Sequence, residues 1–212
     1  MKIMKTIPLT LLLLVTGIGH AAQKAVTDTG EEVLLKRDGT WEYLDARRNR
    51  DIAITTIDKP FSKPAEANFQ LKSKVNGSAF WLNTEKWRFG KGSNNEDAEY
   101  EFELKDGDLY AMAITEGIMI PAESLADIAL ETAADHAPDA RITRRESREV
   151  NGNRLIYQEI DFSMHGVDFT YLGYYFADES GATQLIAYTA ANLTEKYRPE
   201  IELLLNGLVS QP

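Results

Sequence analysis

The chain has 212 residues, of which 43% are hydrophobic and 26% are charged, so its composition is that of a folded globular protein and not of a disordered one. It contains no cysteine, which excludes disulfides, thiol catalysis, iron–sulfur clusters, cysteine-based zinc sites and a lipid-anchored N-terminus of the lipoprotein type. The formal net charge of −10 disfavours nucleic acid and anionic lipid headgroups as partners and is compatible with cations or basic partners.

The N-terminus predicts a secretory signal peptide. Two lysines precede a short apolar run, Ile7–Val15, and small residues follow it as far as Ala22. The run is too short to cross a bilayer, which takes about 20 residues. Cleavage is expected after Ala21, which places Gly19 at the −3 position, or otherwise after Ala22. With residues 1–21 removed, the protein is expected to be periplasmic or secreted in a bacterium, soluble, without a transmembrane segment and not a lipoprotein.

Residues 22–44 predict a small β-meander. Two turns, Asp28-Thr29-Gly30 and Arg37-Asp38-Gly39, separate three short apolar runs, and Asp-Gly between such runs is typical of a hairpin. Three short strands are only marginally stable alone, so Trp41 is expected to pack on another part of the protein. Residues 45–66 are predicted to be a linker, because their arginine cluster and two prolines suit neither a helix nor a central strand.

Residues 67–212 are predicted to form the main domain. Aromatic and leucine side chains alternate with glutamates over Glu99–Leu104, which indicates a half-buried strand. An apolar face over residues 121–137, with proline in the first turn, predicts an amphipathic helix. The charged segment 140–150 reads as a strand that lies at an edge or has one wet face.

Two hairpins are predicted next along the chain. Asn151-Gly152 is a preferred two-residue turn. A turn at His165-Gly166 pairs Phe162 with Phe169, and the same register brings Asp161 and Asp168 to the opposite face of the hairpin.

A last helix is predicted near the C-terminus. Asn192 or Thr194 is expected to cap it, and Pro199 is expected to kink or restart it. Strands, a helix, four antiparallel strands and a final helix, in that order, predict an α+β fold with helices covering an antiparallel β-sheet.

The second half of the chain resembles the Mog1/PsbP-like fold, an α/β/α sandwich. The segments that carry the resemblance are Val150–Asn153, Phe169–Phe176, Thr183–Ala187 and Tyr197–Leu205. Proteins with this fold are mostly non-enzymatic, so the resemblance implies a binding or assembly role, and it does not identify the partner.

Aromatic side chains are the candidate partner-binding residues, namely Trp81, Trp87, Tyr174 and Tyr175. Most aromatic residues of the sheet must belong to the core. Tyr174 and Tyr175 are neighbours on one strand and point to opposite faces, so one of them is expected to line a groove or contact a partner.

Ionisable residues give weaker indications. Asp161, His165 and Asp168 form a candidate weak cation site at a hairpin turn, although such turns are commonly polar. The carboxylates that recur at every second position over residues 97–103 are expected to be the solvated side of a strand and not the facing pair of a glycosidase. His136 is expected to act as a cation at a helix C-terminus. No cofactor is expected.

Three functions remain open from the sequence. The first is a non-enzymatic periplasmic protein that binds or escorts another envelope protein. The second is a small-molecule or cation-binding module, and the third is an enzyme with an acidic site of a type not yet recognised.

Overall fold

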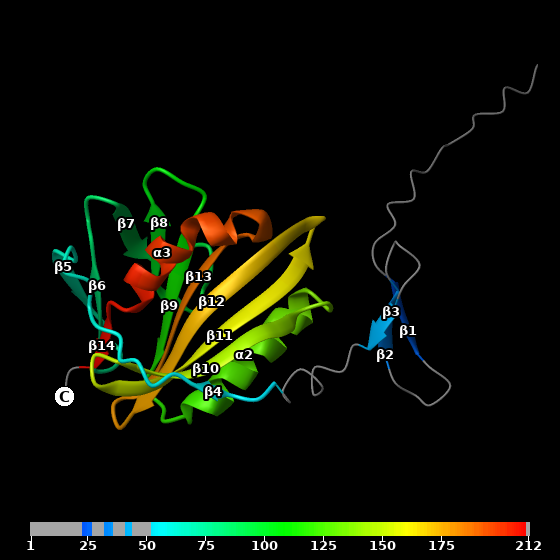
Figure 1. Ribbon diagram of the computed structural model, residues 1–212, viewed down its shortest axis with the longest axis horizontal. Helices are drawn as coiled ribbons and strands as arrows, with labels where there is room; N and C mark the ends of the chain where they lie inside the picture. Colours follow the sequence, from blue (N-terminus) through cyan, green and yellow to red (C-terminus); the bar gives the residue numbers. More distant parts are fainter. Residues whose placement is uncertain (1–22, 27–31, 36–40, 44–51, 211–212) are drawn as a thin grey trace, which may run out of the picture. The chain divides into compact units, whose positions relative to one another are not determined.

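The computed structural model describes residues 23–26, 32–35, 41–43 and 52–210 of the chain (Figure 1). The chain divides into two units, Met1–Tyr43 and Leu44–Pro212. The predicted signal peptide, residues 1–21, lies outside the described residues.

The first unit contains a three-stranded antiparallel sheet. Its strands are β1 (Gln23–Val26), β2 (Glu32–Leu35) and β3 (Trp41–Tyr43), in the order β1-β2-β3. The prediction of a small meander is therefore confirmed. The expected packing of Trp41 concerns a side chain outside the described part of the chain.

The second unit is built on an eight-stranded sheet. Its strands are β4 (Thr55–Thr56), β7 (Trp87–Lys91), β8 (Ala98–Leu104), β9 (Tyr110–Glu116), β10 (Arg141–Val150), β11 (Asn153–Met164), β12 (Val167–Asp178) and β13 (Gly181–Ala190). They lie in the order β4-β10-β11-β12-β13-β9-β8-β7, and the pairing is antiparallel throughout except between β4 and β10.

Each face of this sheet carries its own layer (Figure 1). One layer consists of the helix α3 (Thr194–Leu205), which follows a 3₁₀ turn, η1 (Ala191–Leu193), together with the small sheet of β5 (Phe69–Lys72), β6 (Ser78–Leu82) and β14 (Leu208–Ser210). The other layer is the helix α2 (Ala122–His136), which packs on β10 to β13. We call the two sides of the sheet the α3 face and the α2 face. The prediction of an α+β sandwich is confirmed.

A separate apolar core fills each interface. On the α3 face, Leu204 and Leu205 of the helix pack with Phe80, Phe102 and other buried side chains of the strands. On the α2 face, the buried residues of the helix pack in two clusters against β10 to β13. Along β8 and β9 every second side chain points to the α3 face, because successive side chains of a strand point to opposite faces. The buried residues of these two strands therefore recur at every second position.

The hairpin register is as predicted. Phe162 pairs with Phe169, and Asp161 pairs with Thr170 on the other face. His165 and Gly166 both have positive φ, 52° and 82°, which is the conformation of a type I′ turn. The turn at residues 151–152 has the same conformation, with φ of 53° and 82°.

The predicted linker needs correction, because residues 55–61 pair with the main sheet. Thr55 and Thr56 form a parallel edge strand on β10, and Phe61 forms a further bridge with Val150. This addition makes β10 an inner strand, and three of its charged residues, Arg145, Glu146 and Arg148, are buried, whereas Arg141, Arg144 and Glu149 are exposed. The composition of a segment does not reveal that a neighbouring strand needs an edge partner.

The C-terminal helix also differs from expectation. It begins after Leu193 with no side-chain cap, and the hydroxyl of Thr194 is buried without a partner in the described structure. It runs without interruption through Pro199, whose side chain is exposed. The chain then turns at Gly207 and forms β14, which the sequence pattern did not predict, because β14 is only three residues long.

Candidate functional site

The four candidate aromatic residues do not form one surface. Tyr174 and Tyr175 are fully buried on opposite faces of the sheet, and Trp87 is 2% exposed. The expectation that Tyr174 or Tyr175 lines a groove needs correction, because α3 covers one ring and α2 covers the other. Trp81 is the one member of the four that is partly accessible.

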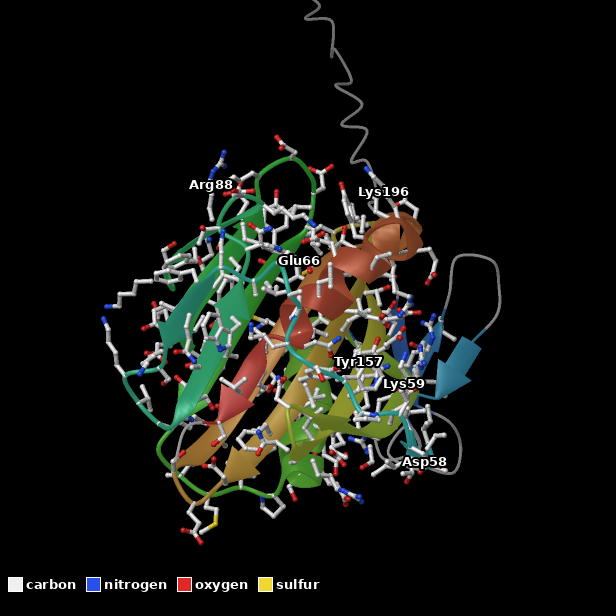
Figure 2. The ribbon with its side chains drawn as sticks, turned by 60° about the vertical axis from the view of Figure 1, so that its left-hand side comes forward. Asp58, Lys59, Glu66, Arg88, Tyr157 and Lys196 are labelled. Atoms are coloured by element: carbon white, nitrogen blue, oxygen red, sulfur yellow. The ribbon has the colours of Figure 1, made fainter. Side chains whose placement is uncertain are left out.

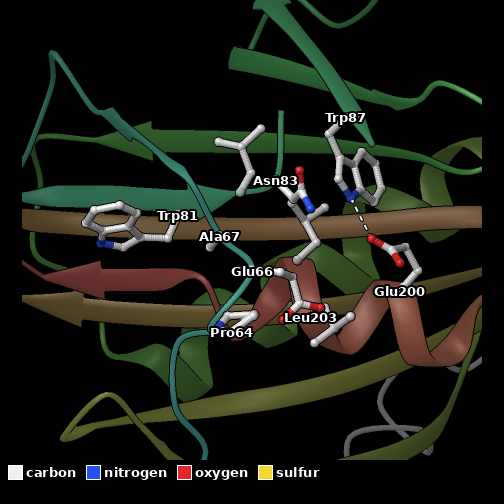
Figure 3. Close-up of a pocket in the computed structure, with 10 residues that line it drawn as sticks. Pro64, Glu66, Ala67, Trp81, Asn83, Trp87, Glu200 and Leu203 are labelled. Carbon is white, nitrogen blue, oxygen red and sulfur yellow. Dashed lines mark hydrogen bonds between the residues drawn. The ribbon is translucent and has the colours of Figure 1, made fainter. Parts of the chain in front are cut away.

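Trp81 and Trp87 do line one shallow pocket (Figure 3). Its other walls come from α3 and from the segment that precedes β5, and its lining residues are Pro64, Glu66, Ala67, Trp81, Leu82, Asn83, Trp87, Glu200, Leu203 and Leu204. Figure 3 shows the two indole rings at opposite ends of the pocket.

Trp87 and Glu200, two polar residues of the pocket, already bind each other. Trp87 donates its indole N–H to Glu200 Oε1 at 3.1 Å, and Lys86 Nζ lies 2.8 Å from Glu200 Oε2. The hydrogen bond with Glu200 raises the pKa of Lys86. At the other end, Lys63 Nζ lies 4.5 Å from the centre of the Trp81 ring. The cavity volume is only about 10 Å³, room for about one water molecule, whereas small-molecule sites occupy roughly 300–1,000 Å³.

The candidate cation site at the hairpin turn is not assembled. Asp161 accepts a hydrogen bond from Thr170 at 2.8 Å, and Asp168 accepts one from Ser163 at 2.6 Å. His165 is exposed in the turn itself. No group of three or more His, Cys, Asp or Glu side chains arranged to hold a metal ion occurs in the part of the chain that the structure describes. The register that brings the two aspartates to one face also gives each a hydroxyl donor, and Arg141 Nη2 lies 3.6 Å from Asp161 Oδ2.

A buried network of charges lies on the α3 face and was not predicted. Arg198 of α3 donates to both carboxylate oxygens of Glu159, at 2.7 and 3.2 Å, and Arg144 Nη1 lies 3.4 Å from the same carboxylate. Arg148 is 2.7 Å from Glu146, and its guanidinium stacks 3.6 Å from the centre of the Tyr157 ring. Tyr157, which lies on β11, is labelled in Figure 2.

The network holds Glu159 ionised. Burial raises the pKa of Glu159, but hydrogen bonds from Arg198 and Tyr157 and the positive charges of Arg198 and Arg144 outweigh it, so the pKa lies below its usual value. Burial raises the pKa of Tyr157, and the neighbouring Glu159 raises it further. Every charge of this network has a partner of opposite sign, so the arrangement joins α3 to the sheet and leaves no group free for acid–base chemistry. Its sequence signal was the alternation of arginine and glutamate over residues 144–148.

The acidic strand is divided between the two faces. Glu99 lies at a register shift between Ala98 and Tyr100, and it accepts hydrogen bonds from Thr115 (2.5 Å) and Ser73 (2.7 Å) on the α3 face. Burial raises the pKa of Glu99, but these bonds and one from the Lys74 backbone lower it to below its usual value. A β-bulge therefore turns Glu99 away from the solvated carboxylates of this strand. The strict alternation of side chains, on which the prediction was based, does not reveal a bulge.

An exposed aromatic pair links the two sheets. Phe69 of β5 and Phe89 of β7 are 40% and 38% exposed, and their rings stack with centroids 5.2 Å apart. β5 and β7 are the outermost strands of their sheets. The sequence showed Phe89 only as part of an alternating run, and it gave no sign that Phe69 lies beside it.

In the described residues no helix is long and apolar enough to cross a membrane.

Comparison of the sequence with protein-family models and with curated proteins gives no match. The structure is similar to the solution structure of cyanobacterial PsbP from Synechocystis sp. PCC 6803, with a TM-score of 0.54 and 12% identity over 70% of this chain and 95% of that one. A Pseudomonas aeruginosa protein of unknown function, described as a putative regulator, has a TM-score of 0.44 and 11% identity over 68% of this chain and 99% of that one. LpqN, involved in cell envelope biogenesis of Mycobacterium tuberculosis, has a TM-score of 0.36 and 11% identity over 76% of this chain and 90% of that one. At these identities the likeness concerns the fold alone, and the chain has a Mog1/PsbP-like fold, as predicted.

Proposed function

We propose that this is a non-enzymatic protein of the bacterial periplasm that binds or escorts another envelope protein. The observation that carries the proposal is the stacked pair Phe69–Phe89, which remains exposed where two sheet edges meet. Exposed aromatic side chains are enriched at protein interfaces, where they supply large contact areas at little entropic cost. The leader sequence of residues 1–21 supports export, and the PsbP-like fold is compatible with a binding role.

The other two functions have less support. A small-molecule module needs a larger pocket than the one beside Trp81, and a cation module needs a cluster of ligands that the described residues do not form. An acidic enzyme site needs carboxylates free to exchange protons. Glu200 in the pocket is bound by Trp87 and Lys86, and Glu99 is bound by three donors.

In-cell cross-linking of the full chain, followed by purification and mass spectrometry, tests the proposal. We expect one envelope protein to be captured in stoichiometric amount by the wild type, and to be lost when both Phe69 and Phe89 are changed to Ser. Ile128→Ser is the matched control, because Ile128 is similarly exposed (41%) but lies on α2, over the other face of the sheet. Absence of any partner above background for the wild type would contradict the proposal.

The proposed compartment is tested separately. Osmotic-shock fractionation should release the protein with the periplasmic contents, and N-terminal sequencing should find the mature chain beginning after Ala21, or after Ala22. Recovery of the uncleaved chain in the cytoplasm would contradict export.

A further inference from the structure

We infer that the rim formed by β5 and β7 binds an extended acidic segment of a partner protein, which adds as a strand to the open edge of β7. The inference rests on the proposed function and specifies its surface and the chemistry of its partner. Three observations support it: an open strand edge, an exposed aromatic pair and a group of unpaired lysines.

The edge of β7 presents unpaired backbone groups. β7 is hydrogen-bonded to β8 on one side and is the last strand of the sheet on the other. Lys86 O accepts from Lys105 N, and Gly92 N donates to Glu99 O. The backbone N–H and C=O groups of residues 86 and 92 therefore point toward β8. Bonded positions alternate along an antiparallel strand, and the backbone groups of Phe89 and Lys91 therefore point to the open side. Such an edge is the template to which an extended peptide adds.

The aromatic pair supplies an apolar anchor at this edge. Phe89 stacks on Phe69, and Figure 1 shows β5 and β7 at the same edge of the second unit. A residue of the added strand directly opposite Phe89 would lie on the same side of the sheet as both rings, because cross-strand pairs share a face. We therefore expect an apolar residue at that position of the partner.

The charge of the rim selects an acidic partner. Lys72, Lys74 and Lys91 are exposed, and in the described chain no carboxylate lies within ion-pair distance of any of them. By contrast, Lys86 and Arg88, on the same side of the molecule, are each paired with a glutamate. Two of these lysines, Lys72 of β5 and Lys91 of β7, belong to the rim, and in a chain with a net charge of −10 they complement negative charge on a partner.

Lys72 and Lys91 lie near each other and near the phenylalanine pair. Tyr100 is the strand partner of Lys91, and its hydroxyl donates to Lys72 O at 2.9 Å, so Lys72 and Lys91 are both neighbours of Tyr100. Phe69 and Phe89 make the next contact along β5 and β7. An added strand with an apolar residue opposite Phe89 would thus place the residue two positions away opposite Lys91, where a carboxylate fits.

A fluorescein-labelled octapeptide of sequence Thr-Glu-Thr-Val-Thr-Glu-Thr-Val provides a direct probe. We expect saturable binding to the full chain by fluorescence anisotropy, weakening with added salt. We expect no binding of the same peptide with Lys in place of Glu. Amide hydrogen exchange should slow at Phe89 and Lys91 when the acidic peptide is bound.

Two variants test the assignment to the rim. Reversing both charges, Lys72→Glu with Lys91→Glu, should weaken binding at least about fivefold. Lys91→Glu alone should also weaken binding, and Lys59→Glu is its charge-matched control. Lys59→Glu should bind as the wild type does, because Lys59 precedes Phe61 beside β10, the opposite side of the sheet (Figure 2). Thermal unfolding of each variant shows whether it is folded.

The outcomes separate this inference from the proposed function. Failure of the acidic peptide to bind, equal binding of the Lys peptide, or protection of β5 amides in place of β7 amides would each overturn the assignment to β7. A partner captured by cross-linking in cells would still support the proposed function in that case. If the peptide binds as expected but no partner is captured in cells, the proposed function fails and the rim remains an acidic-strand site.

Discussion

Tyr174 and Tyr175 are neighbours on β12, yet only the Tyr174 hydroxyl is hydrogen-bonded among the described residues. The Tyr174 hydroxyl donates to Asn206 Oδ1 at 2.7 Å and accepts from Arg148 Nη1 at 3.2 Å. The Tyr175 hydroxyl, equally buried, has no hydrogen-bond partner among the described residues. Tyr174 thus connects the sheet to the end of α3. Tyr175 packs in the apolar core under α2, and its hydroxyl is unpaired there among the described residues.

The first prediction compares the removal of each hydroxyl. Tyr175→Phe should leave stability unchanged or increase it by up to about 1 kcal/mol, because a buried unpaired hydroxyl costs free energy. Tyr174→Phe should destabilise the protein by about 1–2 kcal/mol, because Arg148 Nη1 and Asn206 Oδ1 each lose the hydrogen bond that they make with the Tyr174 hydroxyl. Urea unfolding of both variants measures the difference, and an equal loss in the two would contradict this interpretation.

The second prediction concerns the charge network. Glu159→Gln should lower the free energy of unfolding by about 2 kcal/mol at pH 7, less than the ~3–5 kcal/mol of a fully buried pair because Arg198 is partly solvated. Glu195→Gln is the matched control: Glu195 also binds Arg198, at 2.8 Å, but its side chain is 79% exposed, so little change is expected. Denaturant titrations at constant pH test this pair.

The same carboxylate predicts a dependence on pH. The pKa of Glu159 is lower in the folded protein than its usual value of 4.5, so its contribution to stability is complete above that pH and is lost as the pH falls through the lowered value. The wild type should therefore lose stability on acidification, and the difference between it and Glu159→Gln should shrink. A difference that stays constant from pH 7 to pH 3 would show that Glu159 does not act through its charge.

Local patterns predicted the hairpins well, because their information lies within a few residues. The register of β11 and β12 follows from the turn at His165-Gly166 and from the match of Phe162 with Phe169. The edge strand β4 and the strand β14 could not be found in this way, since each is short and depends on a strand distant in the sequence, β10 or β6.

The candidate site was predicted less well, for a related reason. Exposure of an aromatic residue depends on which layer covers it, and α2 and α3 cover Tyr175 and Tyr174. Phe69 and Phe89 remain exposed because two edges end there, and they are 20 positions apart in the chain. Periodicity places a residue on a face of a strand, but it does not say where the layer above that face ends.

The fourth prediction concerns the turn after α3. A Cβ at Gly207 would lie 1.9 Å from Trp81 O, and Trp81 N–H donates to Gly207 O at 2.8 Å, so the two backbones are in close contact. Gly207→Ala should therefore destabilise the protein by about 2–3 kcal/mol, because backbone atoms must shift to make room. Gly90→Ala is the control, since a Cβ there meets nothing within 4 Å. Equal midpoints of thermal unfolding in the two variants would refute the close contact.

The last prediction concerns Asn151, which connects three segments of the second unit. Its side chain accepts from Lys63 N–H at 2.7 Å and donates to Asn206 O and Leu208 O at 2.9 and 2.8 Å, while its backbone has a φ of 53°. Asn151→Ala should lose these bonds and also strain the turn, at a total cost of about 2–4 kcal/mol. Asn151→Gly relieves the strain but not the loss of bonds, so its stability should fall between those of Asn151→Ala and the wild type. Urea unfolding measures this order, and an Asn151→Gly variant as stable as the wild type would show that the turn conformation alone explains the asparagine.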